Sequence, residues 1–371
     1  MEINNKFNFM TMDTSEKKFE EDIESSLLSE GYRKISRNAY DPESMIFPDA
    51  LIEFLKNSQP KDWARYEKYY GDNAKEKLVR RLNDAIDSSD VLDVLKNGID
   101  DMGIKLKLCY FKPDSTLNAN LNELYSKNII GVTRQFPYST KNSNTIDMVL
   151  SVNGIPVFAF ELKNQLKGQD YACAIRQWKE DRDPKEPIFK FAKRFLAYFA
   201  VDLYEVWMTT ELKGDGTYFL PFNQGSNGAG NPGGKGNPAN PNGYVTSYLW
   251  EEVFAKDSLL DLIHRFITIT EEKKETLVNG VAKKSIVKKL IFPRFHQYDV
   301  VYKVLDDVKE NGSGRNYLIE HSAGSGKSNS IAWIAYRLAS VFNEDEKPIF
   351  DTVIVVTNRI VLDSQLQDTI N

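Results

Sequence analysis

The stretch TIDMVLSVNGIPVFAFELKN, residues 145–164, indicates the fold of this chain. Two apolar runs flank Asn153-Gly154, and an Asn-Gly pair between such runs is the strongest short-range signal for a β-hairpin. The second run, PVFAF, is apolar at every position, so we expect its strand to be buried on both faces. Charged residues at the end of a buried strand, here Glu161 and Lys163, need partners or a function. The hairpin therefore predicts both the centre of a sheet and a candidate site.

The candidate chemistry comes from Asp147 on the first arm of the hairpin and from Glu161 and Lys163 on the second. Hydrolysis of a phosphodiester needs a hard cation, and Mg²⁺ binds carboxylate oxygens. Lys163 follows Glu161 by two positions, so both side chains point to the same face of the strand. There the ammonium group can orient the attacking water or stabilise a negative transition state. Taken alone, the same three residues also fit an ordinary solvated strand.

The strand register decides whether the two carboxylates can meet. A simple two-residue turn at Asn153-Gly154 pairs Asp147 with Phe160 and points Glu161 to the opposite face. A shared metal ion therefore requires a shift of one residue, through an odd-length loop or a β-bulge, with Gly154 in the left-handed region. Carboxylates on opposite faces would instead favour a non-catalytic fragment with a decayed site.

The pattern ID-x12-FELK is similar to the core of PD-(D/E)xK nucleases, and the whole stretch resembles the restriction subunit of type I restriction-modification enzymes. This resemblance implies that Asp147 and Glu161 bind Mg²⁺ and that Lys163 assists catalysis. It also implies a supporting role for Glu20, which stands in FEEDI at the place of the family's first-helix acid. An ordinary helix carboxylate is the alternative for Glu20.

A second supporting residue follows from the same resemblance. Gln177, after AIR, matches the glutamine of the family's QxxxY motif, which supports the active site and contacts DNA. The chain departs from that motif at Asp181, which stands where the tyrosine is expected. The alternative for Gln177 is an exposed helix residue without a role in the site.

The segment HSAGSGKS, residues 321–328, predicts a phosphate-binding loop. The strict pattern GxxxxGK[ST] fails at His321, but the segment resembles the loops of superfamily 2 helicases and the HxxGSGK[ST] form usual in type I restriction subunits. Glycines let the backbone N–H groups curl around phosphates at the start of a helix. The resemblance implies that Lys327 reaches the phosphates of ATP and Ser328 ligates Mg²⁺. The implied loop residues are Gly324, Ser325, Gly326, Lys327 and Ser328.

Two flanking segments fit the same resemblance. FPRFHQ looks like the adenine-reading motif of that superfamily, in which Gln297 hydrogen-bonds the adenine edge and Arg294 stacks on or flanks the base. VIVVTNRIVLDSQL resembles the next helicase motif, whose threonine and arginine approach the DNA backbone. Asn358 stands where that motif often has Asp.

The coarse pattern predicts helices over residues 15–31, over most of 40–102, over 170–200 and over 296–310. Strands are predicted at IIGVTRQF, EVWMTTEL and TYFLPF, and then at RNYLIEH and DTVIVVT around the glycine loop. Strand, loop, helix and strand in that order predict the beginning of a parallel α/β sheet.

The chain is therefore expected to be an α/β protein with a PD-(D/E)xK nuclease domain followed by the first part of a RecA-like superfamily 2 helicase domain. We place the nuclease domain at residues 1–265, with a mobile Gly/Asn/Pro-rich loop at 223–243. A connector occupies residues 266–285, and the incomplete motor domain occupies 286–371. The resemblance implies a longer subunit, so ATP hydrolysis by this chain alone is not expected.

Composition narrows the class of protein. With 371 residues and 41% hydrophobic content, the chain is long enough for two or three globular domains. Cys109 and Cys173 lack CxxC spacing, which argues against a zinc site or a disulfide framework. No segment is apolar enough for a signal peptide or membrane span, so a soluble, intracellular and cytoplasmic protein without membrane contact is expected.

Charge is unevenly distributed along the chain. The net charge is −5, but residues 1–100 carry 15 Lys and Arg against 21 Asp and Glu, a balance of −6. Residues 161–194 carry nine basic and six acidic residues, a local excess of +3. Contacts with DNA phosphates are therefore expected in that second segment. A solvated helix face explains the same charges equally well.

The leading hypothesis is a type I restriction subunit that uses Mg²⁺ and ATP to cut and translocate double-stranded DNA. Its implied partners are the methyltransferase and specificity subunits of the complex. Two alternatives stay open: a nuclease–helicase of another defence or repair system, and a non-catalytic DNA-binding or assembly fragment.

Overall fold

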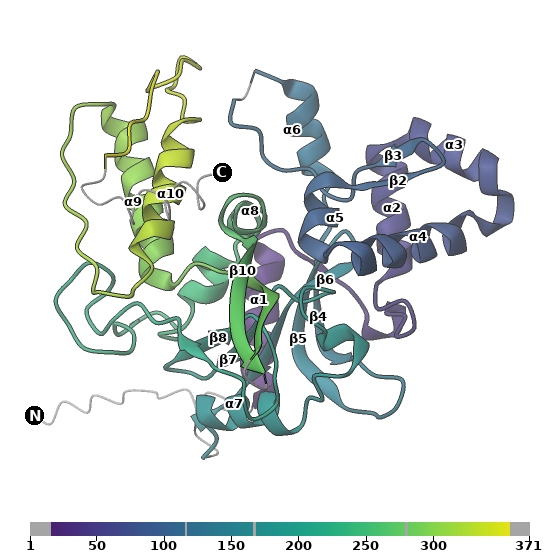
Figure 1. Ribbon diagram of the computed structural model, residues 1–371, viewed down its shortest axis with the longest axis horizontal. Coiled ribbons are helices and arrows are strands. Elements are labelled where there is room, and N and C mark those ends of the chain that lie inside the picture. The colour runs from purple at the N-terminus through teal and green to yellow at the C-terminus, as the bar shows by residue number, and fades with distance from the viewer. Residues whose placement is uncertain (1–15, 116, 166–167, 279–280, 357–371) are drawn as a thin grey trace, which may run out of the picture.

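The computed structural model describes residues 16–115, 117–165, 168–278 and 281–356, and its centre is a mixed β-sheet (Figure 1). Seven strands lie in the order β1-β4-β5-β6-β7-β8-β9. β1 pairs with β4 and β6 pairs with β7 in parallel, and all other neighbours are antiparallel. The strands are β1 (Arg33–Lys34), β4 (Ile130–Pro137), β5 (Thr145–Val152), β6 (Ile155–Leu162), β7 (Ala197–Val201), β8 (Val206–Thr209) and β9 (Leu220–Pro221). The strands predicted at β4, β5, β6, β8 and β9 are therefore confirmed, whereas β1 and β7 were not predicted as strands.

β5 and β6 form the predicted hairpin at the centre of the sheet. Asn153 and Gly154 have φ values of 49° and 84°, as a type I′ turn requires at both central positions. A Cβ atom on Gly154 would lie 2.5 Å from the carbonyl oxygen of Phe47 and 2.9 Å from the nitrogen of Leu51. The turn therefore needs glycine both for its backbone angle and for its close packing.

A β-bulge shifts the register of this hairpin. Near the turn Ser151 pairs with Pro156, but the next pair joins Leu150 to Phe158. Val157 is thus an extra residue in β6, and beyond it every pair is displaced by one position. The one-residue shift that a shared metal requires is present, and it comes from a bulge rather than from an odd-length loop.

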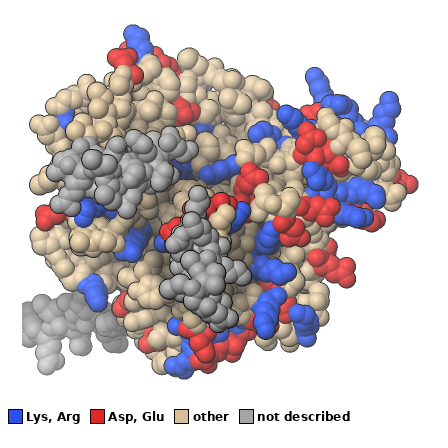
Figure 2. All heavy atoms as spheres, viewed as in Figure 1, with Lys and Arg blue, Asp and Glu red and all other residues tan. Residues whose placement is uncertain are grey.

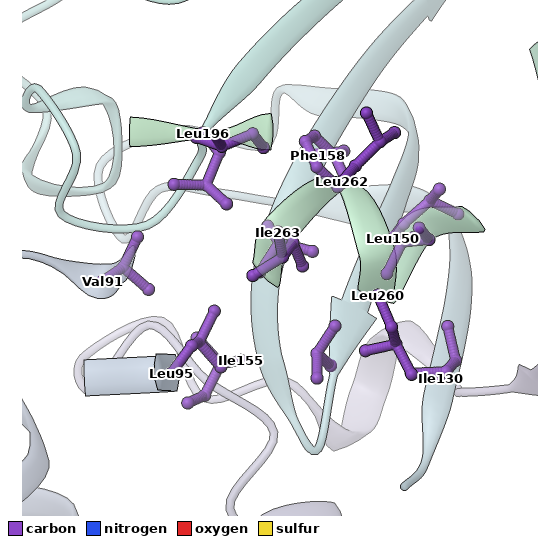
Figure 3. Close-up of a cluster of buried hydrophobic side chains, with 14 of the residues drawn as sticks. Val91, Leu95, Ile130, Leu150, Ile155, Phe158, Leu196, Leu260, Leu262 and Ile263 are labelled. Carbon is purple, nitrogen blue, oxygen red and sulfur yellow. The ribbon is translucent and has the colours of Figure 1, made fainter. Parts of the chain in front are cut away.

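Both faces of the sheet are covered, so every residue of β6 is buried as predicted. α1 (Glu16–Ser29), η5 (Leu249–Val253), α8 (Lys256–Asp261) and η6 (Leu262–Phe266) contribute to the larger hydrophobic core. α7 (Tyr171–Glu180) packs through Ala174 and Trp178 into a second, smaller core. Figure 3 shows part of the larger core, where side chains from the sheet meet those of helices distant in sequence: Val91, Leu95, Ile130, Leu150, Ile155, Phe158, Leu196, Leu260, Leu262 and Ile263.

Residues 40–102 are mostly helical, as predicted, and form an arm on one side of the sheet (Figure 1). On its visible surface, acidic and basic side chains are interspersed (Figure 2). This pattern is typical of a solvated helical surface. The elements of this region are α2 (Pro48–Ser58), α3 (Pro60–Tyr70), α4 (Ala74–Ser88), α5 (Val91–Asn97), β2 (Ile99–Asp101), β3 (Ile104–Leu106) and, further along, α6 (Ala119–Ser126).

The C-terminal part of the described chain contains a hairpin and two helices. β10 (Thr268–Val278) and β11 (Val281–Ile291) are paired along their whole length and occupy most of the predicted connector. α9 (Phe295–Asn311) confirms the helix predicted at 296–310, and α10 (Lys327–Leu338) confirms the helix after the glycine loop. The Gly/Asn/Pro-rich loop at 223–243 precedes η5 and touches α9, where the Lys303 ammonium donates to the carbonyl of Ala229 at 2.9 Å.

Three elements expected from sequence are wrong or only partly right. RNYLIEH at 315–321 and residues 351–356 form no strand in the described chain, although the second segment contains the β-branched run at 352–356. Leu318 is 93% exposed and Val356 86%, because neither segment pairs with a neighbouring strand. The expected parallel sheet around the glycine loop is therefore absent from the described residues. The helix predicted over 170–200 ends at Glu180, since the apolar run after it is the buried strand β7.

A partly buried ion-pair network joins α10 to the end of α8. The Asp261 carboxylate accepts hydrogen bonds from Arg337, from the Tyr302 hydroxyl, and from Arg265 at 3.1 Å. Trp333 on α10 donates its indole N–H to the carbonyl of Phe266 at 3.1 Å. These contacts hold the helix of the glycine loop against the sheet domain. None of the helices in the described segments has the length and apolar content needed to cross a lipid bilayer.

Candidate functional site

The register shift brings three predicted residues together at the end of the hairpin. Met148 pairs with Phe160, so the next position along the two strands puts Asp147 opposite Glu161. The backbone N–H of Leu162 donates to Asp147 Oδ2 at 2.8 Å, which orients this carboxylate. Lys163 Nζ lies 3.7 Å from the same oxygen. The bulge thus gathers two carboxylates and an ammonium group at one point.

Glu161 is fully buried, and its two oxygens have different surroundings. Oε1 accepts hydrogen bonds from Nε and Nη2 of Arg182 at 2.9 and 2.6 Å. Oε2 has no hydrogen-bond partner among the described residues. Burial raises the pKa of Glu161 well above its usual range, the Asp147 charge raises it further, and the Arg182 guanidinium opposes both. A buried oxygen without a partner is costly, and a bound cation would satisfy it.

Lys163 bridges the carboxylates to the first helix. Its ammonium group donates to Glu16 Oε1 at 2.8 Å as well as lying near Asp147. Burial lowers the pKa of Lys163, but the charges of Asp147 and Glu16 outweigh burial and raise it. The side chain is therefore a cation held against the carboxylate pair.

Glu20 on α1 reaches the site through Gln135. Gln135 Nε2 donates to Glu20 Oε1 at 2.9 Å and to Asp147 Oδ1 at 3.5 Å. Arg134 Nε donates to the other Glu20 oxygen at 3.0 Å. Burial raises the pKa of Glu20 and the Asp147 charge contributes, while the Arg134 bond acts in the opposite sense. Glu20 is thus one bridging amide away from Asp147.

Gln135 carries a backbone feature that the sequence does not signal. It lies in β4 across from Asp147, between the pairs Arg134–Met148 and Phe136–Ile146, yet its φ is +50°. A non-glycine residue in the left-handed region is strained by of order 1–3 kcal/mol, and such residues cluster at functional sites. The hydroxyl of Thr145 donates to Gln135 Oε1 at 2.8 Å, so both ends of the amide are held. IIGVTRQF looks like a regular strand, and nothing in it predicts this angle.

Gln177 reaches the same site from α7. A cleft of about 560 Å³ opens beside Asp147, and it is lined by Ser143, Asn144, Thr145, Asp147, Gln177, Asp181 and Arg182. Asp181 is the C-cap of α7, and its carbonyl accepts from the Tyr138 hydroxyl at 3.4 Å. Tyr138, which directly follows β4, therefore lies beside Asp181, the position at which the QxxxY motif has its tyrosine.

The carboxylate pair can hold a metal ion only with help from other ligands. Within the described part of the chain, no three His, Cys, Asp or Glu side chains are arranged around a common point. Mg²⁺ usually keeps several waters and takes one or two carboxylates from the protein. Two carboxylates, one with a buried oxygen that no described residue pairs with, therefore fit Mg²⁺ better than a metal that needs a complete protein cage.

The glycine loop is a compact turn at the start of α10. Gly324 and Gly326 have φ values of 74° and 85°, which lets the backbone curl before the helix begins at Lys327. Lys327 Nζ donates to the carbonyls of His321 and Ser322 at 2.8 and 3.0 Å. The ammonium group thus lies inside its own loop, where a phosphate group would compete with these carbonyls. Ser328 lies in the first turn of α10, at the positive end of the helix dipole.

The predicted adenine motif contacts this loop directly. Gln297 Oε1 accepts from the backbone N–H of Arg294 at 2.9 Å, and its Nε2 donates to the carbonyl of Gly326 at 2.8 Å. Ser325 is buried, and its hydroxyl has no hydrogen-bond partner among the described residues. The two segments recognised separately in the sequence therefore form one structural unit. Asn358 and the rest of the next helicase motif lie outside the described residues.

The fold and this site define a mixed α/β protein that carries a buried carboxylate pair and a glycine loop at the start of a helix. Comparison with known families narrows that class. Residues 13–217 match the family described as type I restriction enzyme R protein N terminus, and the chain belongs to this family. Residues 296–371 are similar to the SWI2/SNF2 ATPase family.

Curated relatives agree with this assignment. The chain is 22% identical over 366 residues to the putative type I restriction enzyme MjaVIIIP endonuclease subunit of Methanocaldococcus jannaschii. The aligned region covers 94% of this chain and 31% of that relative. The MjaVIIP subunit of the same organism is 26% identical over 75% of this chain and 23% of its own length. The type I restriction enzyme HindI endonuclease subunit of Haemophilus influenzae is 26% identical over 60% of this chain and 19% of its own length. The chain thus spans less than a third of the length of each of these relatives.

Proposed function

We propose that this chain is the nuclease-bearing part of the restriction subunit of a type I restriction-modification enzyme, and that it cuts double-stranded DNA with Mg²⁺. The observation that carries the proposal is the displaced hairpin register, which puts Asp147 opposite Glu161. One buried oxygen of Glu161 has no hydrogen-bond partner in the part of the chain that the structure describes. The named function of the relatives as endonuclease subunits supports it. On this view residues 16–265 have the PD-(D/E)xK architecture.

Each residue has a role that follows from its contacts. Asp147 and Glu161 hold Mg²⁺, which neutralises charge on the scissile phosphate and acidifies the attacking water. Leu162 N–H fixes Asp147 Oδ2 by its 2.8 Å bond. Lys163 exchanges its bond to Glu16 for one to the water or to the developing negative charge. Glu20 supports the site through Gln135, and Gln177 contacts DNA along the cleft.

We also propose that the glycine loop binds ATP in a RecA-like motor and that ATP-dependent translocation precedes cleavage. The similarity of residues 296–371 to SWI2/SNF2 ATPases supports this role. Lys327 releases His321 and Ser322 to bind the phosphates, and Ser328 binds the associated Mg²⁺. The backbone at Gly324, Ser325 and Gly326 surrounds the phosphates. For Gln297 to read adenine, with Arg294 beside the base, its bonds to Arg294 N and Gly326 O must open.

The complete activity belongs to a complex with methyltransferase and specificity subunits, which supply DNA recognition. A decayed nuclease would be expected to leave the carboxylates on opposite faces, and the observed register argues against it. A nuclease–helicase of another defence or repair system shares the same chemistry, but the relatives found over most of this chain are restriction subunits.

The test is the Asp147→Ala variant in the full-length subunit, reassembled with its methyltransferase and specificity subunits. The proposal expects DNA cleavage to be lost while DNA-stimulated ATP hydrolysis is retained. Asp84→Ala on the exposed face of α4 is the matched control and should leave both activities unchanged. Unchanged cleavage by Asp147→Ala would mean that the hairpin carboxylates are structural.

A further inference from the structure

Arg182 is a buried cation that the sequence patterns do not single out. It follows α7 directly after the C-cap Asp181, and its side chain is only 3% exposed. Two of its N–H groups converge on Glu161 Oε1, at 2.9 and 2.6 Å. The guanidinium carbon also lies 5.2 Å from the centre of the Tyr138 ring, which packs against it.

One nitrogen of Arg182 connects both strands of the hairpin. Nη2 donates to Glu161 Oε1 in β6 and, at 2.8 Å, to the backbone carbonyl of Thr145 in β5. Thr145 is two residues before Asp147. A single planar group therefore sets the position of the Glu161 side chain relative to the strand that carries Asp147.

This arrangement matters because a glutamate carboxyl group rotates easily about its last torsion angle. The fork of Arg182 occupies Oε1 and removes that freedom, while Oε2 has no partner in the described structure. The charges packed around the Glu161 carboxylate are Asp147 from β5, Arg182 after α7, and Lys163 directly after β6. Glu16 and Glu20 of α1 interact in turn with Lys163 and Asp147.

We propose that Arg182 is a positioning residue for the metal site: it holds Glu161 by Oε1 and thereby directs Oε2, beside Asp147, toward the divalent cation. The inference rests on the proposed function, because it requires that Asp147 and Glu161 bind that cation. It adds a residue from outside the hairpin that lines the same cleft as Asp147 and acts by positioning Glu161.

The variants Arg182→Lys and Arg182→Gln separate the effect of the Arg182 charge from the effect of its planar geometry. A lysine keeps the positive charge but has no planar fork, so it cannot hold Oε1 and the Thr145 carbonyl together. A glutamine loses the charge and has a single donor nitrogen, whereas arginine has three. If charge were the only contribution of Arg182, Arg182→Gln would bind a divalent cation more tightly, because a repulsive cation is removed. If positioning dominates, both variants bind the cation more weakly.

The test measures Mn²⁺ binding to the 371-residue chain by electron paramagnetic resonance, with Mn²⁺ standing in for Mg²⁺. Wild type should bind Mn²⁺, and Glu161→Gln should lose this binding. Arg182→Gln should weaken it at least tenfold, and Arg182→Lys should fall between Arg182→Gln and wild type. Arg65→Gln, an exposed arginine on α3, is the matched control and should bind like wild type. Circular dichroism establishes that each variant is folded. If Arg182→Gln does not fold, Mn²⁺ binding by Arg182→Lys is compared with wild type instead.

In the reassembled complex the same variants should raise the Mg²⁺ concentration needed for half-maximal cleavage, while the rate at saturating Mg²⁺ is largely restored. Mn²⁺ binding by folded Arg182 variants that equals or exceeds wild type overturns the inference and leaves the proposed metal site intact. Equal binding by wild type and Glu161→Gln overturns the proposed metal site, and the positioning role with it.

Discussion

Asp147 and Glu161 lie opposite each other across β5 and β6 because Val157 is an extra residue in β6. Without that bulge, the type I′ turn at Asn153-Gly154 would pair Asp147 with Phe160 and turn Glu161 to the other side of the sheet. A bulge of this kind re-aims side chains and commonly lies next to an active site. The candidate site therefore depends on one inserted residue in an otherwise regular hairpin.

Lys163→Ala in the reassembled complex should abolish DNA cleavage and leave ATP hydrolysis and translocation intact. The ammonium group lies 3.7 Å from Asp147, at the carboxylate pair and away from the glycine loop. Loss of a charged group that stabilises the transition state costs roughly a hundredfold to a thousandfold in rate. Gel analysis of DNA products alongside an ATPase assay measures both activities. Cleavage that survives this change would remove Lys163 from the mechanism.

Lys327→Ala should remove cleavage as well as ATP hydrolysis, because translocation precedes cutting in the proposed sequence of events. In the 371-residue chain, the variant should also lose any thermal stabilisation by ATP. Lys327 is exposed and bonds only to loop carbonyls among the contacts found for it, so the fold itself should be little affected. Lys303→Ala on α9 serves as a surface control. Full cleavage by Lys327→Ala would show that the nuclease works without the motor.

Gln135→Gly should be more stable than Gln135→Ala by about 1 kcal/mol, as only glycine adopts a φ of +50° without strain. Both variants lose the bonds to Glu20 and Asp147, so their difference isolates the backbone angle. Urea denaturation gives the two free energies of unfolding. At Thr133, a regular position in the same strand, the order of the glycine and alanine variants should reverse. Equal stability of the two Gln135 variants would contradict the assigned backbone angle.

Asp261→Asn should destabilise the chain by about 1–3 kcal/mol near neutral pH, since it leaves the partly buried Arg337 without its ionic partner. Burial raises the pKa of Asp261, but Arg337, Tyr302 and Arg265 outweigh burial and hold it below its usual value. A carboxyl group with a lowered folded-state pKa stabilises the fold above its unfolded pKa of about 3.9, and this contribution is lost as the pH falls through the folded value. The difference in unfolding free energy between wild type and Asp261→Asn should therefore shrink below about pH 4. Urea denaturation at several pH values measures it, and a difference that stays constant down to about pH 3 would show that Asp261 does not titrate as proposed.

Local sequence patterns were enough to predict the β5–β6 hairpin and the helices α1, α9 and α10. The Asn-Gly turn, the apolar run before Glu161 and the helical stripes of α1, α9 and α10 act over a few residues, so the sequence predicts them directly. The same patterns were insufficient for residues 315–321 and 351–356. A segment with strand-forming residues becomes a strand only when a neighbouring strand pairs with its backbone, and these two segments have no such neighbour among the described residues.

The reactive groups can be read from the amino-acid sequence: Asp147, Glu161 and Lys163 near the turn, and Lys327 before a helix. How the first three meet depends on the packing of the folded chain. The bulge at Val157, the positive φ of Gln135 and the approach of Arg182 to Glu161 arise from contacts between strands and between a strand and a helix end. Such contacts depend on register and packing across distant segments, where a shift of one residue reverses the direction of a side chain.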